Sequence, residues 1–137
     1  MKLVGFSFKK ISIERTSDNL KGLKINSKIN IQEIQSVHSD FMQKGQDVIK
    51  IDFTYDIDYE SKIAKIQLAG QVLLAAPKEQ AEELVNGWKD KKIKEEYKIA
   101  IFNVILKKSN VKALELEEDM NLPFHVPFPT LKQQKKE

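Results

Sequence analysis

The sequence predicts an α+β fold in which a four-stranded antiparallel sheet is followed by a short helix and a long helix packed on it. Up to Ala76 the chain alternates apolar and polar residues with period two, as strands with one buried face do. After Pro77 the apolar spacing becomes helical, and the links between strands are too short for crossover helices. The length of 137 residues suits one domain, expected over residues 1–131.

The strand expected at residues 49–59 carries the clearest alternation. Polar residues fill its even positions, so one face is expected to be buried and the other solvated. Residues 22–34 and 64–74 repeat the pattern and are expected to form two further strands. The apolar face of the strand at 49–59 consists of Ile49, Ile51, Phe53, Tyr55, Ile57 and Tyr59.

The first strand is expected near the N-terminus and needs an irregularity. Phe6 and Phe8 lie on one phase of the alternation, whereas Ile11 and Ile13 lie on the other. A β-bulge near Lys9 would reconcile the two phases. Between the third and fourth strands only a few polar residues are available, which predicts a tight hairpin.

Three aspartates share the outward face of the third strand: Asp52, Asp56 and Asp58. Residues two apart on a strand lie about 7 Å from each other. If this strand pairs with the second, Lys24 and Lys28 can act as cross-strand partners. A charged ladder is therefore favoured over a site for a hard cation.

Pro77 marks the change from strands to helices, because proline is well suited to the start of a helix. Acidic residues follow it, as the positive N-terminal end of a helix favours. This short helix is expected to end near Val85, where Asn86 and Gly87 can terminate it.

A longer helix is expected from about Asp90 to Lys108. Its apolar side chains recur at helical spacing, so this helix is expected to cover the sheet or to meet another subunit. The stripe consists of Ile93, Tyr97, Ala100, Ile101, Val104 and Ile105.

The segment at 121–131, called the strap below, contains three prolines that forbid a helix and cannot donate ladder hydrogen bonds. It is expected to run extended. Its apolar residues indicate that it packs onto something, either by closing the core of its own chain or by lining a binding groove.

The titratable residues of the loops have ordinary interpretations. His38, in a polar loop at 35–46, and His125, in the strap, lie outside helical spacing of a carboxylate, which favours surface or packing roles. The acidic run from Glu115 to Asp119 is expected to be a solvated turn, with docking of a basic partner as the alternative. Trp88, between the two helices, is expected to cap the core, or to mark an interaction surface if it is exposed.

Composition and charge narrow the function classes. The net charge of +3 comes from 23 basic and 20 acidic residues, which is typical of a mixed solvated surface. The absence of cysteine fits a reducing compartment, and no apolar run is long enough for a membrane span or a signal-peptide core. A cytoplasmic protein without membrane insertion is expected. Residues 132–137 read as a basic disordered tail, with a nucleic-acid or acidic-partner arm as the alternative.

No chemical motif is evident. The five glycines form neither a dinucleotide-binding nor a phosphate-binding loop, and no nucleophile and base stand in a recognisable arrangement. We therefore expect a non-enzymatic protein without cofactor or metal. A nucleic-acid module is disfavoured, because no strand combines aromatic and basic residues into a stacking platform.

The order of elements resembles that of the SecB family of export chaperones. Residues 66–74 (IQLAGQVLL) are similar to the fourth strand of that family, residues 99–106 (IAIFNVIL) occupy the place of its long helix, and residues 120–123 (MNLP) resemble the turn after it. The resemblance spans roughly residues 5–131. It implies a homo-oligomer, a dimer or a tetramer, that holds unfolded or nascent polypeptides in apolar grooves without ATP.

Such a chaperone exposes apolar and aromatic surface rimmed by charges. The side chains expected to bind peptide are Trp88, Leu122, Phe124, Val126 and Phe128. Those expected at an oligomer interface are Tyr97, Ile101 and Ile105. The alternative is a structural or adaptor subunit that binds one specific protein through the same helix and strap.

The sequence also departs from the family. The strap replaces the final short helix, and the crossover region at 77–92 has few glycines and aromatic residues. Proteins of the family are typically acidic on the sheet surface that docks the SecA motor, whereas this chain is net basic. Binding of a secretion motor is therefore not carried over.

Overall fold

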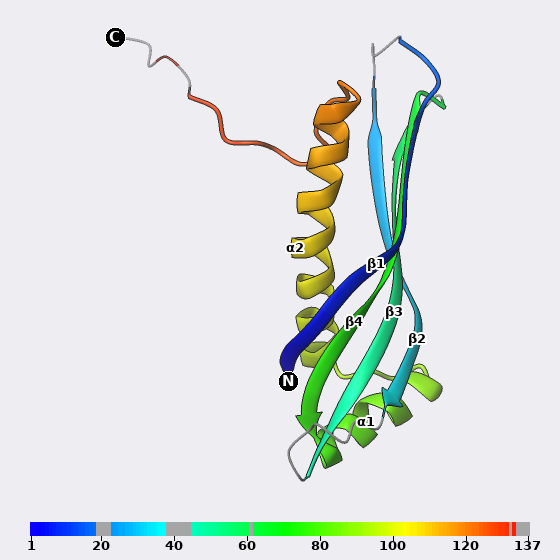
Figure 1. Ribbon diagram of the computed structural model, residues 1–137, viewed down its shortest axis with the longest axis vertical. Helices are drawn as coiled ribbons and strands as arrows, with labels where there is room; N and C mark the ends of the chain where they lie inside the picture. Colours follow the sequence, from blue (N-terminus) through cyan, green and yellow to red (C-terminus); the bar gives the residue numbers. More distant parts are fainter. Residues whose placement is uncertain (19–22, 38–44, 61, 132, 134–137) are drawn as a thin grey trace.

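The computed structural model describes residues 1–18, 23–37, 45–60, 62–131 and 133 of the chain, so His38 and nearly all of the expected tail lie outside the described residues. Two helices follow four strands (Figure 1), and the α+β class is confirmed. The elements are β1 (Lys2–Arg15), β2 (Ile25–Val37), β3 (Gln46–Tyr59), β4 (Ala64–Pro77), α1 (Lys78–Lys89) and α2 (Glu95–Asp119).

The four strands form one antiparallel sheet in the order β1-β4-β3-β2. The register shift between Phe8 and Lys10 confirms the predicted bulge. Two further shifts, between Leu3 and Gly5 and between Ile31 and Glu33, were not predicted. The shift after Ile31 returns Ile34 to the inward face, where 1% of this residue is exposed, and it keeps β2 paired with β3 as far as Val37.

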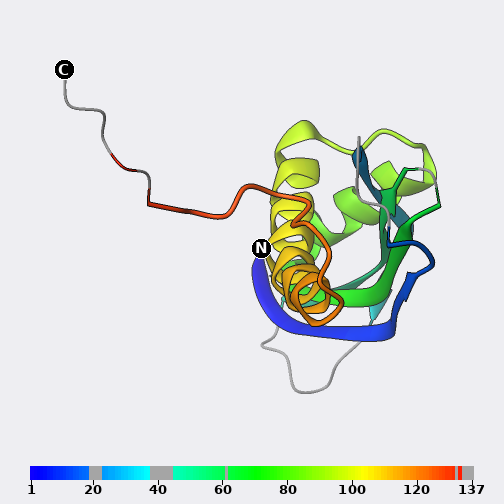
Figure 2. The same ribbon diagram turned by 90° about the horizontal axis from the view of Figure 1, so that it is seen from above.

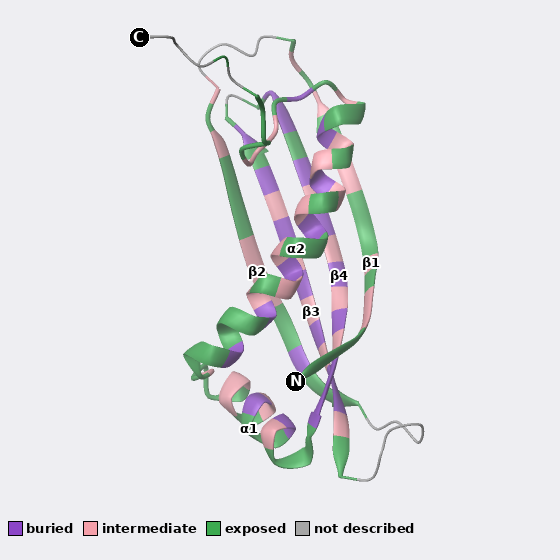
Figure 3. Cartoon of the chain, turned by 90° about the vertical axis from the view of Figure 1, so that its left-hand side faces the viewer, coloured by how far each residue is buried: buried purple, intermediate pink, exposed green. Residues whose placement is uncertain are grey.

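The inward face of the sheet is the expected one. All six odd-numbered residues of β3 from Ile49 to Tyr59 are at most 2% exposed. Helix α2 crosses this face diagonally (Figure 2, Figure 3), with its N-terminal end on the β2 side. Its buried side chains follow one i, i+4 stripe, which consists of Tyr97, Ile101, Ile105, Ser109, Ala113 and Glu117.

The outward face of β3 is charged, as expected, but its partners differ in part. Lys28 lies opposite Asp56 in the β2–β3 register, whereas Lys24 precedes β2. Lys65 of β4, which was not predicted as a partner, lies opposite Asp58. Lys9 Nζ is 3.8 Å from Asp52 Oδ1. Within the described part of the chain, no group of three or more histidine or acidic side chains is arranged to hold a metal ion.

Helix α1 was expected to end near Val85, but it continues to Lys89. Gly87 does not stop the helix. Its missing Cβ leaves room for the returning chain, because an added Cβ would lie 2.8 Å from the Lys92 carbonyl oxygen. The residues between Lys89 and Glu95 then form a turn in which Lys91 has a φ of 57°, so α2 begins later than expected.

Helix α2 was expected to end at Lys108, but it runs to Asp119. Ser109 and Asn110 follow directly, and neither ends the helix. Both are accommodated inside the protein, Ser109 at 0% exposure and Asn110 through a hydrogen bond to Tyr55. The acidic run expected to be a solvated turn therefore forms the last turns of α2.

A Schellman motif ends α2. Asn121 adopts a φ of 52°, its N–H donates to the Glu118 carbonyl, and the Leu122 N–H donates to the Glu117 carbonyl. Arg15 of β1 donates to the carbonyl oxygens of Met120 and Asn121, at 2.8 and 3.1 Å. Sheet and helix are thus joined where the strap begins.

The strap contains no helix or strand. Its first residue after the turn, Leu122, is 5% exposed and belongs to the core cluster beneath the C-terminal end of α2. The side chain of His125 is also buried, and only the residues after Val126 leave the body (Figure 1), where Phe128 and Leu131 are exposed.

We predict that Gly70→Ala destabilises the fold. A Cβ at Gly70 would lie 2.5 Å from the Ser7 carbonyl oxygen and 3.1 Å from the Phe53 ring, so the β1–β4 pairing must shift. We expect a loss of about 1–3 kcal/mol in the free energy of unfolding, measured by chemical denaturation.

Gly5→Ala is the matched control for this prediction. It lies in the same strand pair, but its nearest neighbour is the end of the flexible Leu73 side chain at 3.1 Å. Equal effects of the two substitutions would contradict the close approach at Gly70.

Candidate functional site

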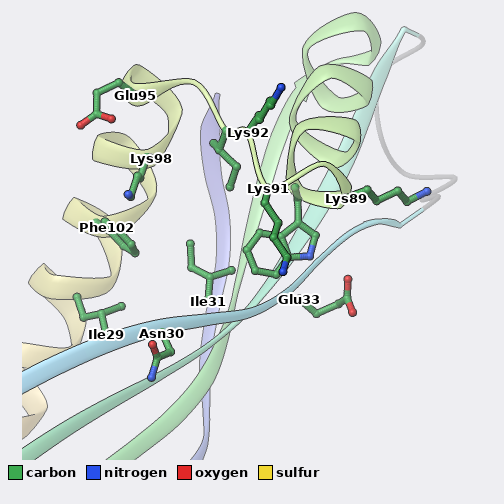
Figure 4. A pocket seen from close by; sticks show the side chains of 12 residues that line it. Ile29, Asn30, Ile31, Glu33, Lys89, Lys91, Lys92, Glu95, Lys98 and Phe102 are labelled. Atoms are coloured by element: carbon green, nitrogen blue, oxygen red, sulfur yellow. The ribbon is translucent and has the colours of Figure 1, made fainter.

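A groove of about 630 Å³ opens between the N-terminal end of α2, the α1–α2 turn and strand β2. Ile29 and Ile31 project into it from β2, and Phe102 faces them from α2 (Figure 4). The full lining consists of Ile29, Asn30, Ile31, Glu33, Trp88, Lys89, Lys91, Lys92, Ile93, Glu95, Lys98 and Phe102. The groove thus has an apolar floor with charges around it.

A smaller hollow of about 240 Å³ continues the groove along β2. Its lining includes Ser27, Tyr55 and Leu106, and it shares Ile29 and Phe102 with the larger one. The combined surface follows β2 from Ser27 to Glu33. At the usual rise per residue, the distance from Ser27 to Glu33 along the strand is about 20 Å.

Contacts between the two helices hold the far wall of the groove. The Lys92 N–H donates to the Gly87 carbonyl at 2.7 Å and folds the turn back over the end of α1. Glu83 of α1 accepts a hydrogen bond from the Tyr97 hydroxyl at 3.1 Å and forms an ion pair with Lys94. The hydrogen bond from Lys94 lowers the pKa of Glu83, and the same bond raises the pKa of Lys94.

Strand β2 lies at an edge of the sheet, so its backbone pairs with β3 on one side only among the described strands. Its inward-facing isoleucines, Ile29 and Ile31, are only half-buried, because α2 packs over β3 and β4 and leaves this edge open. Open edges of this kind accept extended polypeptide in many recognition domains.

Of the residues expected to bind peptide, Trp88 lines the groove. It is half-buried and also packs against the core, as the core-capping interpretation expected. Its role in binding stays a prediction. The other four lie in the strap, at the opposite end of α2. Leu122 is buried, Phe124 and Val126 are half-buried, and the Phe124 and Phe128 rings lie 5.5 Å apart.

The three residues expected at an oligomer interface lie in the core of this chain. Tyr97, Ile101 and Ile105 are 7%, 0% and 0% exposed and face the sheet. Their burial gives no support to an interface role, because the fold of one chain already covers them. Oligomer formation itself stays a prediction.

A buried polar cluster joins the strap to the sheet beneath the C-terminal end of α2. His125 Nδ1 lies 2.8 Å from Glu117 Oε1, and His125 Nε2 lies 2.8 Å from Asn110 Oδ1. The Tyr55 hydroxyl donates to Asn110 Oδ1 at 2.8 Å, and the backbone N–H of His125 donates to Glu117 Oε2 at 3.1 Å. The Tyr59 hydroxyl shares its hydrogen between Glu117 Oε2 and the Pro123 carbonyl.

This cluster resembles acid–base machinery only in composition. The side chains of His125 and Glu117 are 1% and 0% exposed, so neither can reach a substrate in this conformation. Instead, polar groups of β3, α2 and the strap act as hydrogen-bond partners for one another. A buried carboxylate requires such partners. The packing role expected for His125 agrees with this arrangement, whereas the burial of Glu117 was not expected.

The comparisons with known proteins concern the fold. No family model matches the sequence, and no curated protein matches it. The structure of the SecB-like chaperone Rv1957 from Mycobacterium tuberculosis, in complex with a ChAD peptide from the Rv1956 HigA1 antitoxin, superposes with a TM-score of 0.51. The match covers 98% of this chain and 92% of that chain at 11% sequence identity. The fold is SecB-like.

The groove was largely missed by the sequence reading. The inward phase of Ile29 and Ile31 was recognised, but their exposure was not, because it depends on where α2 crosses the sheet. Phe102 and the lysines of the α1–α2 turn were not singled out. The signal that could have revealed them is the run Trp88-Lys89-Asp90-Lys91-Lys92, which places cations beside the single tryptophan.

None of the helices in the described residues is both long and apolar enough to cross a bilayer.

We predict that Gly87→Ala disturbs the groove. A helical Gly→Ala change ordinarily stabilises by up to about 1 kcal/mol, but here the added Cβ would meet the Lys92 carbonyl at 2.8 Å. We expect the variant to be less stable and the emission of Trp88 to shift. Asn86→Ala, at an exposed position of the same helix, is the control. Stabilisation by both substitutions would contradict the role of Gly87.

We predict that alkaline unfolding is linked to Tyr59. Burial raises the pKa of its hydroxyl, and Glu117 raises it further. The folded state therefore keeps a proton that the unfolded chain loses near pH 10, so this contribution to stability is present below about pH 10 and is lost as the pH rises above it. In a phenolate absorbance titration, Tyr59→Phe should reduce the signal that appears only on unfolding.

Burial also raises the pKa of Tyr55, so part of that late signal should remain in the Tyr59→Phe variant. The protein in denaturant is the control, in which all the tyrosines ionise together. A late signal of unchanged amplitude in the variant would contradict the role of Tyr59.

Proposed function

We propose that this protein is a non-enzymatic, ATP-independent chaperone that holds apolar segments of non-native polypeptides in the groove beside β2. The observation that carries the proposal is an accessible apolar floor, formed by Ile29, Ile31 and Phe102, within a stable fold. Soluble proteins rarely leave such a surface open without a binding role. The SecB-like fold supports the same conclusion.

The shape of the groove suits polypeptide better than a small molecule. It is open on the side of the β2 edge and continues along that strand through the second hollow. A small-molecule site typically encloses most of its ligand. An extended chain instead needs a long, open surface with room for side chains.

The strap is a second candidate surface. Phe128 is 59% exposed beside Phe124, so a client could also contact this pair. The strap and the groove lie at opposite ends of α2, whose 25 residues span about 37 Å. A client that engaged both would therefore need a long unfolded region.

We predict that the protein suppresses aggregation of a chemically unfolded client at a near-stoichiometric ratio. Ile31→Ser with Phe102→Ser should weaken this activity, because it removes the apolar floor. Ile99→Ser with Val111→Ser is the matched control, since both residues are exposed on α2 at 51% and 67% and lie outside the groove. Phe124→Ser with Phe128→Ser tests the strap separately.

Thermal unfolding followed by circular dichroism establishes that each variant is folded. Light scattering on the same samples measures the mass and tests the expected dimer or tetramer. If the wild-type protein leaves aggregation unchanged, or if the control pair of substitutions abolishes suppression as strongly as the groove pair, the groove is not a holdase site.

The alternative is an adaptor that binds one specific protein. It is favoured by the complex of the structural neighbour, which contains a peptide from a single antitoxin. Suppression of aggregation for unrelated clients distinguishes the two functions, because an adaptor should bind one protein and ignore the others.

A further inference from the structure

We propose that the groove selects extended apolar segments flanked by acidic residues. The proposal rests on the proposed function, since it names the occupant of the same groove. The floor provides the apolar contacts, and the charges around it decide which flanking residues are accepted. The occupant is a segment of another protein.

The rim of the groove is predominantly basic. Four lysines and two glutamates belong to the lining of the larger hollow: Lys89, Lys91, Lys92, Lys98, Glu33 and Glu95. All four lysines are exposed. The field at the rim therefore favours carboxylates over ammonium groups.

These cations are available to a ligand. Among the described residues, Lys89, Lys91 and Lys92 form no ion pair, in contrast to Lys94, which is paired with Glu83. The Lys98 ammonium lies 5.8 Å from the centroid of the Phe102 ring, at the mouth of the groove.

The acidic residues of the lining do not neutralise this end. Glu33 lies next to the inward-facing Ile34 and opposite Asp52 in the register, so it belongs to the outward face of the sheet. Figure 4 shows its carboxylate on the other side of β2 from the Ile31 side chain. Glu95, the first residue of α2, then leaves one carboxylate against four lysines in the lining.

Charge argues against the strap of a second copy as the occupant. The strap is apolar, but the sequence after it continues as Lys132-Gln133-Gln134-Lys135-Lys136. Placing those lysines beside the lysines of the rim would be repulsive. An apolar segment with acidic neighbours meets the same floor without that repulsion.

The length of the site defines the length of the segment. The surface follows β2 from Ser27 to Glu33, so an extended segment of about seven residues fits along it. The cations gather at the α1–α2 turn, beyond Ile31. Acidic residues at the end of the segment that reaches this turn should therefore contribute most to the binding affinity.

The test uses three peptides with one shared apolar core and with glutamate, serine or lysine flanks, none containing tryptophan. Trp88 is the single tryptophan and lines the groove, so its emission reports occupancy, while anisotropy of labelled peptides gives the affinity. Because exposed ion pairs are individually weak, we expect the glutamate peptide to bind about tenfold more tightly than the lysine peptide. The preference should shrink as the salt concentration rises.

Lys91→Glu with Lys92→Glu should remove or invert the preference for the glutamate peptide. Lys107→Glu with Lys108→Glu makes the same change in net charge at exposed positions of α2 outside the groove and should leave the preference intact. Equal effects of the two pairs would mean that the net charge of the whole molecule, rather than the rim, determines the preference.

The outcomes separate this inference from the proposed function. If all three peptides bind equally, or if the lysine peptide binds best, selection for acidic flanks is overturned while the groove remains a polypeptide site. If no peptide binds and the emission of Trp88 does not change, the proposed function fails as well. Displacement of the glutamate peptide by single-stranded DNA at equal concentration would indicate a nucleic-acid site and overturn the proposal.

Discussion

The structure depends on the contact between one stripe of α2 and the inward face of β3 and β4. The stripe repeats every fourth residue from Tyr97 to Glu117, and β3 presents a continuous row of buried side chains to it. A helix placed diagonally on a sheet of four strands cannot cover all of them equally. The part of β2 that α2 leaves uncovered becomes the groove, so the opening follows from the packing.

The two ends of α2 are held by different kinds of contact. At the C-terminal end, polar side chains close the fold: Glu117, His125 and Asn110 satisfy one another, and the Schellman motif turns the strap into contact with the core. At the N-terminal end, a glycine and a few contacts between α1 and α2, among them the Lys94–Glu83 ion pair, hold the turn in place. Lys91 and Lys92 of this turn form no ion pair with any described residue. One end of the helix is thus closed by buried contacts, and the other end borders an open groove.

The sheet was predictable from the sequence because β3 and β4 are buried on one face. Successive side chains of a strand point to opposite faces, so burial of one face places apolar residues at every second position. Helix ends were less predictable. Gly87 would normally stop a helix, but here a carbonyl approaching to 2.8 Å requires a glycine within it. The second helix was expected to end at Lys108, yet it continues to Asp119. There Tyr55 of β3 provides Asn110 with a hydrogen-bond partner that only the folded chain brings near.

The groove itself was beyond sequence reasoning for a similar reason. Whether Ile29 and Ile31 are covered depends on the angle at which α2 crosses, which no local pattern encodes. The strap was expected to bind peptide because its apolar and aromatic residues lie close together in the sequence. The structure divides that segment into a buried start and an exposed remainder. Its role in binding stays a prediction.

An uncovered edge strand also invites a second copy of the same chain to extend the sheet, which is a common first step towards fibres. Two copies meeting along β2 would bring their lysine rims together, and the bulge between Ile31 and Glu33 would spoil the register of the new ladder. Like charges and an irregular edge therefore oppose pairing of two molecules through β2. The apolar floor can in this way lie beside an open edge without that edge recruiting a second sheet.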